Sequence, residues 1–501
     1  MTEKRKMNHA QNEAVKYTDG PLLIVAGAGT GKTTVIANKI GYLLENDLAK
    51  PEEILALTFT DKAAEEMQTR VDEIIDTGYT DLQISTFHSF CQRILEHHAI
   101  DIGLSNQFKL LTPTAAWLLM QKHFRSFNLD YYRPLGNPYR HIHELLKHFS
   151  KCKDELISPE DYLFLAEAKG KEKGDMVIEE QNRLTEISNA YHVYNQLLRD
   201  NAALDFGDLI YYTHELFRKR PNVLQIFQQQ YKYILVDEFQ DVNWGQYALL
   251  RQLVIGGKGR QTPPNLPLER GGSQPQLTVV GDDDQSIYAF RGASVSNILH
   301  FKDDFPKAKE IVLNENYRSV QPILDLAYQS IKNNNPDRLE VKLNIDKKLI
   351  SQRYLSPTLS FVKERGDKPS PPQRRGQGEV VHINAPTLDN EVEDVINEIA
   401  RLKKIDRKAS WDDFAILVRA NNHADPFIGA LERHGLPYEF LSSAGLFRQN
   451  IVLDCLAFLR ILNNYHIDAA WYRLLFLPFL NFKESDLQKL THFSKQKSIP
   501  Y

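Results

Sequence analysis

A glycine-rich turn near the amino terminus constrains the fold of this 501-residue chain more than any other feature. It reads AGAGTGKTT over residues 26–34 and directly follows the apolar run PLLIV at residues 21–25. Such a turn between a buried strand and a helix offers backbone N–H groups and a lysine to phosphate oxygens. The sequence therefore predicts a phosphate-binding loop at the carboxyl end of a parallel strand, within an α/β fold.

The residues of this turn have expected roles around ATP and Mg²⁺. Its glycines let the backbone face the phosphates, Lys32 can reach the β- and γ-phosphates, and the Thr33 hydroxyl can ligate Mg²⁺. The predicted contacts in this segment are Ala26, Gly27, Ala28, Gly29, Thr30, Gly31, Lys32, Thr33 and Thr34. Ala26 stands where the general pattern has glycine. The alternative interpretation is a glycine-rich turn with a chance lysine.

Two adjacent acids follow a second apolar run, YILV at residues 233–236. Asp237 is placed to hold Mg²⁺ through water, and Glu238 to orient or deprotonate an attacking water. An ordinary helix cap is the alternative, but the phosphate loop upstream favours the catalytic interpretation. Together the two motifs predict a nucleoside triphosphatase.

Strands and helices alternate at the spacing expected of parallel α/β domains. From about residue 91 to 200 the chain is rich in Leu, His, Lys, Glu and Gln and is predicted to be helical. A further amphipathic helix is predicted between the last two strands, with apolar residues from Val392 to Leu402. The expected strands are 22–25, 54–59, 233–236, 277–280, 311–313, 380–383 and 414–418.

Composition narrows the class of protein. The net charge is -4, so any basic nucleic-acid surface must be local. Three cysteines far apart in sequence argue against a zinc site or a disulfide framework. No signal peptide or membrane span is evident, and we expect a cytoplasmic protein without a membrane partner.

Two segments rich in Pro, Gly, Arg and Gln interrupt the pattern, at residues 256–276 and 363–378. Neither can supply a packed core, so both are predicted to be surface loop insertions. An arginine-rich nucleic-acid contact is one interpretation, and a tolerated loop expansion is the favoured one.

Several longer strings resemble the UvrD/Rep-type helicases of superfamily 1. They are DEFQD at residues 237–241, VGDDDQSIYAFRGA at 280–293, TFTDKAAEEM at 58–67, STFHSF at 85–90 and LNENYRS at 313–319. The resemblance implies two RecA-like parallel-sheet domains of the P-loop NTPase class, the second one incomplete, with inserted helical subdomains. The implied parts are 1–90 with 203–293 (first domain), 91–202 (helical insertion), 294–440 (second domain) and 441–501 (start of a second helical insertion).

The resemblance also assigns roles at the nucleotide. Gln11 resembles the glutamine that reads adenine, and Tyr317 the tyrosine that stacks on it. Gln285 is similar to the glutamine that contacts the γ-phosphate and the attacking water. Arg318 resembles an arginine finger, supplied by the second α/β domain across a cleft. With Lys32 and Glu238, Gln285 and Arg318 form the expected catalytic set.

Other residues resemble the family's contacts to single-stranded DNA. Phe59 and Tyr288 are similar to aromatic side chains that stack on bases, and His88 lies on the same strand path. Phe290 stands where the family usually has tryptophan. Arg291 either couples the DNA and ATP sites or is a surface ion-pair partner. For the aromatic residues the alternative is packing in a core.

The resemblance implies a motor that moves 3′ to 5′ on single-stranded DNA and unwinds duplex at junctions, in repair or replication. We expect a monomer, with repair or replication proteins as partners. Two later family motifs are not found beyond Asp454. We therefore expect the chain to be the N-terminal portion of such a helicase, with its C-terminal motifs missing. The alternatives are a catalytically weak or inactive ATP- and DNA-binding fragment, or a subunit of a helicase-nuclease.

Overall fold

The chain divides into two compact units, residues 1–380 and 381–501, which are described separately. The computed structural model describes residues 7–75, 82–169, 175–255, 275–287, 296–353, 380–406, 409–440, 450–463 and 468–475, with residues 477, 480, 482 and 486. Of the two predicted loop insertions, residues 256–274 and the whole of 363–378 lie outside this part.

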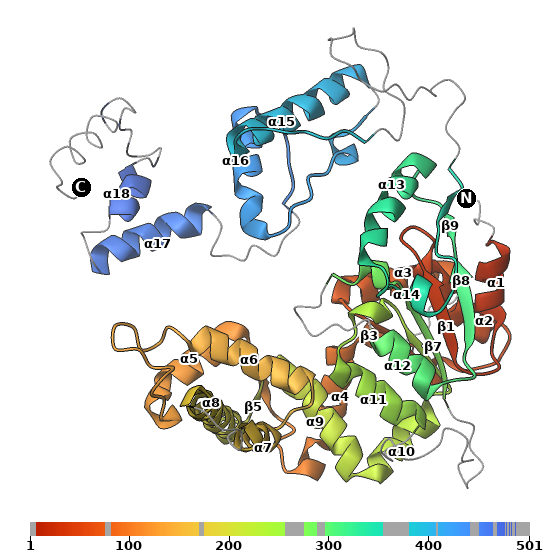
Figure 1. The fold of residues 1–501 in the computed structure, drawn as a ribbon, viewed down its shortest axis with the longest axis horizontal. Helices are drawn as coiled ribbons and strands as arrows, with labels where there is room; N and C mark the ends of the chain where they lie inside the picture. The colour runs from red at the N-terminus through yellow and green to blue at the C-terminus, as the bar shows by residue number, and fades with distance from the viewer. Residues whose placement is uncertain are drawn as a thin grey trace. The chain divides into compact units, whose positions relative to one another are not determined.

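A six-stranded parallel sheet forms the centre of the first unit (Figure 1). Its strand order is β3-β2-β6-β7-β1-β8. The strands are β1 (Leu22–Ala26), β2 (Ile54–Thr58), β3 (Gln83–Thr86), β6 (Tyr233–Val236), β7 (Gln276–Gly281) and β8 (Lys309–Leu313). Because β1, β2 and β6 are buried along their whole length, they are continuous apolar runs in the sequence.

Helices cover both faces of this sheet. Side chains of β1 alternate between two cores, with Leu22 and Ile24 in one and Leu23 and Val25 in the other. The first core adds α1 (His9–Lys16), α2 (Lys32–Glu45) and α3 (Asp61–Ile74). The second adds α4 (Phe87–His98), α9 (Phe206–Lys219), α10 (Pro221–Gln230), α11 (Trp244–Ile255) and α12 (Ser296–Asp304).

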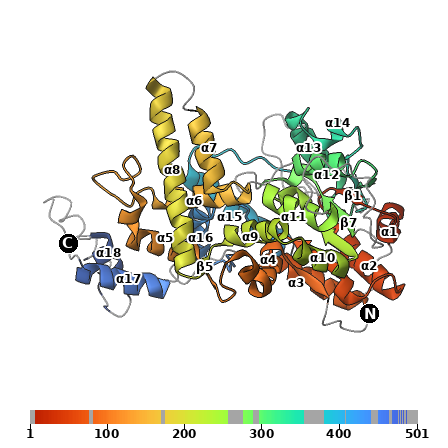
Figure 2. The same ribbon diagram turned by 90° about the horizontal axis from the view of Figure 1, so that it is seen from below.

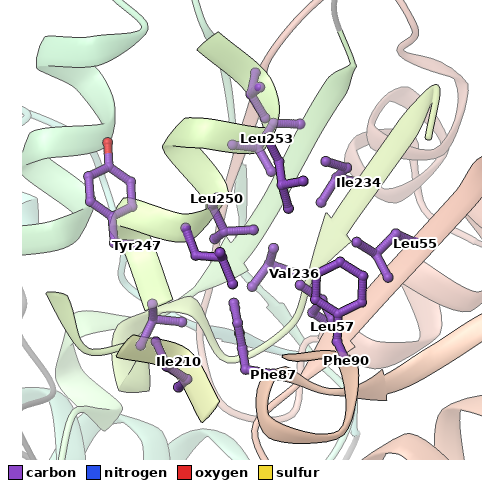
Figure 3. Close-up of a cluster of buried hydrophobic side chains, with 14 of the residues drawn as sticks. Leu55, Leu57, Phe87, Phe90, Ile210, Ile234, Val236, Tyr247, Leu250 and Leu253 are labelled. Carbon is purple, nitrogen blue, oxygen red and sulfur yellow. The ribbon is translucent and has the colours of Figure 1, made fainter. Parts of the chain in front are cut away.

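The close-up in Figure 3 shows this second core between the sheet and its helices. Side chains of β2 and β6 lie opposite Phe87 and Phe90 of α4 and Leu250 and Leu253 of α11. The three-layer arrangement, with a parallel sheet between helices, confirms the predicted α/β class.

A helical part between α4 and α9 has a core of its own. It contains α5 (Pro113–Lys122), α6 (Ile142–Asp154), α7 (Pro159–Lys169) and α8 (Asp175–Asp200), and α7 lies beside α8 (Figure 2). Phe149 stacks on Tyr191 and Tyr194 at its centre. The short strands β4 (Lys109–Leu110) and β5 (Ala203–Leu204) pair at its base.

The predicted start of this helical insertion at residue 91 does not match the packing. Cys91, Ile94 and Leu95 lie on α4 and belong to the core of the sheet. The core of the helical part begins further along the chain, at about Ala116, and ends at Ala203.

The predicted placement of residues 311–313 in a second α/β domain is wrong. They belong to β8, which pairs in parallel with β1, with Ala26 opposite Leu313. A short apolar run identifies a strand but carries no information about the sheet edge that it joins. The segment after β8 forms β9 (Glu315–Asn316), α13 (Gln321–Ile331), α14 (Leu339–Lys342) and β10 (Ile350–Ser351), all in the first unit.

In the second unit, α15 (Leu388–Ile405) and α16 (Asp425–Arg433) pack through Val392, Ile396 and Ala430. The predicted amphipathic helix is therefore confirmed. Between residues 380 and 440, the described positions contain no strand, so the runs at 380–383 and 414–418 are not the predicted strands. The helices α17 (Asn450–Asn463) and α18 (Asp468–Leu475) follow, and the described helices include none that is long and apolar enough to cross a membrane.

Candidate functional site

The glycine-rich turn joins the end of β1 to the first residue of α2. Gly29 and Gly31 have positive φ angles of 73° and 88°, a conformation that side chains with a Cβ disfavour. Gly31 is the N-cap of α2 and supplies no side-chain cap. Its helix therefore presents unbonded N–H groups and the positive end of its dipole, which together suit phosphate oxygens.

Lys32 is the centre of the site. Its side chain is 8% exposed, and its Nζ lies 2.6 Å from Glu238 Oε2 and donates to Gln285 Oε1 at 3.1 Å. These partners follow β6 and β7, which neighbour β1 in the sheet. Parallel strands thus deliver three predicted catalytic side chains to one edge, because their carboxyl ends meet there.

Thr33 and Asp237 form the candidate metal site. Thr33 Oγ1 donates to Asp237 Oδ2 at 2.9 Å, and the backbone N–H of Glu238 donates to Asp237 Oδ1 at 3.0 Å. Burial, with a contribution from the charge of Glu238, raises the pKa of Asp237 to about 6. A hydroxyl beside a buried carboxylate is the oxygen donor set that Mg²⁺ prefers, so these residues fit that ion.

Glu238 adopts the left-handed conformation, with φ of 50°. Such a backbone is unusual for a residue with a Cβ and occurs at functional sites, where the surrounding contacts enforce it. Here the contacts are the Lys32 ammonium and Gln240, whose Nε2 donates to Glu238 Oε2 at 2.7 Å. The carboxylate is held toward the glycine-rich turn.

The hydrogen bonds close into a ring. Gln240 Oε1 accepts from the backbone N–H of Asp282 at 2.9 Å, and Asp282 Oδ2 accepts from Gln285 Nε2 at 2.6 Å. Lys32 Nζ donates to both Glu238 and Gln285, which closes the ring. Sequence reasoning missed Gln240 and Asp282 as members of the site. The strings DEFQD and DDDQ contained both residues, but the contact between them joins the ends of different strands.

A turn after β8 lies against the glycine-rich turn. The backbone N–H of Tyr317 donates to Gly29 O at 2.9 Å, and Asn316 Nδ2 donates to Ala28 O at 2.6 Å. A Cβ added at Gly29 would lie 2.6 Å from Arg318 Cβ. Arg318 is therefore brought to the loop within the first unit, and its predicted delivery by a second α/β domain is wrong.

Gln11 and Tyr317 gather at the start of α1. Gln11 Nε2 donates to Thr30 O at 2.8 Å, while its Oε1 accepts from the backbone N–H of Asn8 at 3.0 Å. Asn8 Nδ2 in turn donates to the Tyr317 hydroxyl at 2.9 Å. The two predicted adenine contacts are thus linked through Asn8. Thr34 is exposed on the first turn of α2.

The predicted DNA contacts are only partly described. Phe59 follows β2 and His88 lies on the first turn of α4, after β3; Thr58 and Thr86 are register partners in these two strands. The His88 ring packs edge-on against Phe206 at 6.0 Å, and burial lowers its pKa. Tyr288, Phe290 and Arg291 lie outside the described residues.

Comparison with protein families matches nearly the whole chain. Residues 7–306 match the UvrD/REP helicase N-terminal domain, and residues 311–500 match the UvrD-like helicase C-terminal domain. Because residues 311–500 match the C-terminal domain model, the expectation that the C-terminal part of the family is missing from this chain is wrong.

Two similar proteins are both called ATP-dependent DNA helicase PcrA. The one from Staphylococcus epidermidis strain RP62A is 33% identical over 495 residues, which is 99% of this chain and 59% of that protein. The one from Staphylococcus aureus strain Mu50 is 33% identical over 493 residues, or 98% of this chain and 58% of that protein. The chain thus spans somewhat more than half the length of these relatives.

Proposed function

This chain belongs to the UvrD/Rep-type family of superfamily 1 helicases, and on that premise we propose that it is an ATP-dependent DNA helicase. It moves along single-stranded DNA from 3′ to 5′ and separates duplex at junctions, in repair or replication. The observation that carries the proposal is the convergence of Lys32, Glu238 and Gln285 beside the Thr33–Asp237 pair.

The proposed binding step moves Lys32. Its ammonium leaves Glu238 and Gln285 for the β- and γ-phosphates of ATP, which the N–H groups of the glycine-rich turn also hold. Thr33 and Asp237 would hold Mg²⁺, which would neutralise part of the phosphate charge. Gln11 and Tyr317 hold the adenine.

The proposed hydrolytic step uses the groups that Lys32 releases. Glu238 orients and deprotonates the attacking water, and its left-handed backbone aims the carboxylate at the loop. Gln285 holds that water and the γ-phosphate. Arg318, next to Gly29, stabilises the charge of the transferring phosphoryl group with a fixed guanidinium fork.

On the DNA side, we propose that Phe59, His88, Tyr288, Phe290 and Arg291 line the path of the strand. Base stacking on aromatic side chains contributes ~1–3 kcal/mol per base and tolerates any base sequence. That property suits a motor that must move along DNA of any sequence. A monomer in the cytoplasm, with repair or replication proteins as partners, fits this role.

The test compares ATP hydrolysis with and without single-stranded DNA for the wild type, Lys32→Ala and Glu238→Gln. Hydrolysis that DNA stimulates and that both substitutions abolish supports the proposal. Equal background rates in all three proteins would leave a non-catalytic binder of nucleotide and DNA. Strand displacement from duplexes with a 3′ or a 5′ single-stranded tail then decides the direction of movement.

A further inference from the structure

A buried ammonium lies among three consecutive carboxylates beside the proposed ATP site. Asp282, Asp283 and Asp284, called the acid triad here, surround Lys347 of the segment between α14 and β10. Lys347 Nζ lies 2.6 Å from Asp282 Oδ1 and 2.8 Å from Asp284 Oδ2, and it also contacts Asp283 Oδ1. The Lys347 side chain is 4% exposed, so little solvent screens these contacts.

Arg338 supplies the second cation. Its Nε and Nη2 donate to the two carboxylate oxygens of Asp284 at 2.8 and 2.7 Å, while Nη1 lies 2.6 Å from Glu340 Oε2. The backbone N–H of Leu339 donates to Asp283 at 2.8 Å. Because Arg338 is shared with Glu340 and does not reach Asp282, Lys347 is the cation that the structure gives to Asp282 among the described residues.

Asp282 connects this ammonium to the proposed catalytic groups. One of its carboxylate oxygens faces Lys347, and the other accepts from Gln285 Nε2 at 2.6 Å. That bond fixes which end of the Gln285 amide faces Lys32, because the same amide presents Oε1 to Lys32 Nζ at 3.1 Å. A flipped amide would set two donors against each other at Lys32.

The charges in this cluster depend on one another. Burial alone would lower the pKa of Lys347, but the charges of Asp282, Asp283 and Asp284 outweigh it and raise that pKa. Burial likewise favours the neutral form of Asp284, but hydrogen bonds from Arg338 and Lys347 lower its pKa. For Asp283 burial prevails over Lys347 and raises the pKa. Without Lys347, protons would have to replace part of the missing charge.

We infer that Lys347 is the internal counter-ion of the acid triad and, through Asp282, a positioning residue for Gln285, an inference that rests on the proposed ATP hydrolysis. The triad oxygens lie within 4.8 Å of one another, a spacing that could also hold a metal ion. The Lys347 ammonium lies at that place and contacts all three carboxylates.

The experiment compares Lys347→Met with Lys347→Arg and with the control Lys348→Met. Lys348 is the exposed neighbour, 3.6 Å from Asp325. The first readouts are the affinity for a fluorescent ATP analogue and the single-turnover rate of ATP hydrolysis. For Lys347→Met we expect affinity within about threefold of wild type and a rate at least ~10-fold lower, since positioning of a catalytic group is lost. Lys347→Arg should recover part of the rate, and Lys348→Met should match wild type.

The pH dependence separates positioning from general damage. Among the described residues, Lys347 and Arg338 are paired with the triad, and Lys32 contacts Gln285. Glu340 pairs with Arg338, and Glu238 pairs with Lys32. In Lys347→Met, triad carboxyl pKa values rise, so the acid limb of the rate profile should move to higher pH. A rate that falls equally at every pH, or an unchanged rate, would overturn the inference.

A stability cycle tests the link without hydrolysis. Wild type, Lys347→Met, Gln285→Ala and the double variant are unfolded with denaturant. If Lys347 acts through Asp282 on Gln285, the double variant loses less stability than the sum of the two single losses. Additive losses would overturn the inference even if the wild type hydrolyses ATP. A coupled cycle in a protein that hydrolyses no ATP would reject the proposed function and keep the counter-ion.

Discussion

Replacing Lys153 by methionine tests how the helical part of the first unit is fixed to the sheet. Lys153 lies on α6, is fully buried, and places Nζ 2.7 Å from both Asp205 Oδ2 and Asp208 Oδ1. These two acids form the capping box of α9, whose apolar side chains pack in the sheet's core. The substitution removes one charge and keeps most of the side-chain volume.

The expected loss of stability in Lys153→Met depends on the hydrogen bonds that Asp205 and Asp208 retain. Each retains one backbone N–H, since Asp208 N donates to Asp205 Oδ1 and Asp205 N donates to Asp208 Oδ2, and Tyr194 also donates to Asp205. Removing one partner of a buried ion pair costs ~3–5 kcal/mol. In the variant, one carboxyl can be protonated in place of remaining as an unpaired buried charge. For a carboxyl with an ordinary pKa of ~3.9, protonation at pH 7 costs ~4 kcal/mol, which is the upper limit of the stability loss. We therefore expect a loss of ~3–4 kcal/mol at pH 7.

The stability loss caused by Lys153→Met should be smaller at acidic pH. Burial and the charge of Asp205 already raise the pKa of Asp208 with Lys153 present, and removing Lys153 raises it further. A folded-state pKa above the unfolded value means that stability is present at low pH and is lost as the pH rises. At pH 5 protonation costs only ~1.5 kcal/mol, so the difference from wild type should fall to about that value.

Denaturant unfolding followed by circular dichroism at pH 7 and pH 5 measures both values. Lys151→Met, an exposed position on the same helix, is the matched control and should cost less than ~0.5 kcal/mol. A Lys153→Met loss below ~1 kcal/mol at pH 7, or one that does not change with pH, would refute this account of the buried cluster.

Three further outcomes are expected at the nucleotide site. Glu238→Gln should bind nucleotide ~2–5-fold more tightly, since no ion pair with Lys32 then has to break; weaker binding in an equilibrium titration would contradict this. Gly29→Ala should destabilise the protein more than Gly103→Ala, because both need a positive φ but only Gly29 has Arg318 within 2.6 Å of the added Cβ; equal shifts in Tm would contradict it. Arg318→Lys should lower hydrolysis ~10³-fold while nucleotide affinity is kept, and a rate near wild type would exclude Arg318 as the finger.

The sequence predicted those parts of the site that lie within one strand and the turn after it. The glycine-rich turn, and Asp237 with Glu238, each follow a buried apolar strand, so local pattern placed them at the same edge of a parallel sheet. The family resemblance added Gln285 and Tyr317, and the structure brings both to this edge.

Contacts between distant segments escaped prediction. Nothing in the run at 311–313 shows that it pairs with β1, so the origin of Arg318 was assigned to the wrong domain. Lys347 stands in the stretch LEVKLNIDKKLI at residues 339–350, which contains no motif that marks a lysine for burial. Its three carboxylate partners are more than 60 residues away in the sequence. Burial of a charge is decided by packing, which no local spacing reveals.

Because β1 lies between β7 and β8, its pairing with both strands sets the position of the phosphate loop along the sheet. Gly281 is the register partner of Val25 on one side, and Leu313 is the partner of Ala26 on the other. One residue inserted into β1 would displace the loop by ~3.3 Å relative to Gln285 and Arg318 together. The lengths of these three strands are therefore coupled: a change in the length of β1 shifts the loop relative to the residues that follow β7 and β8.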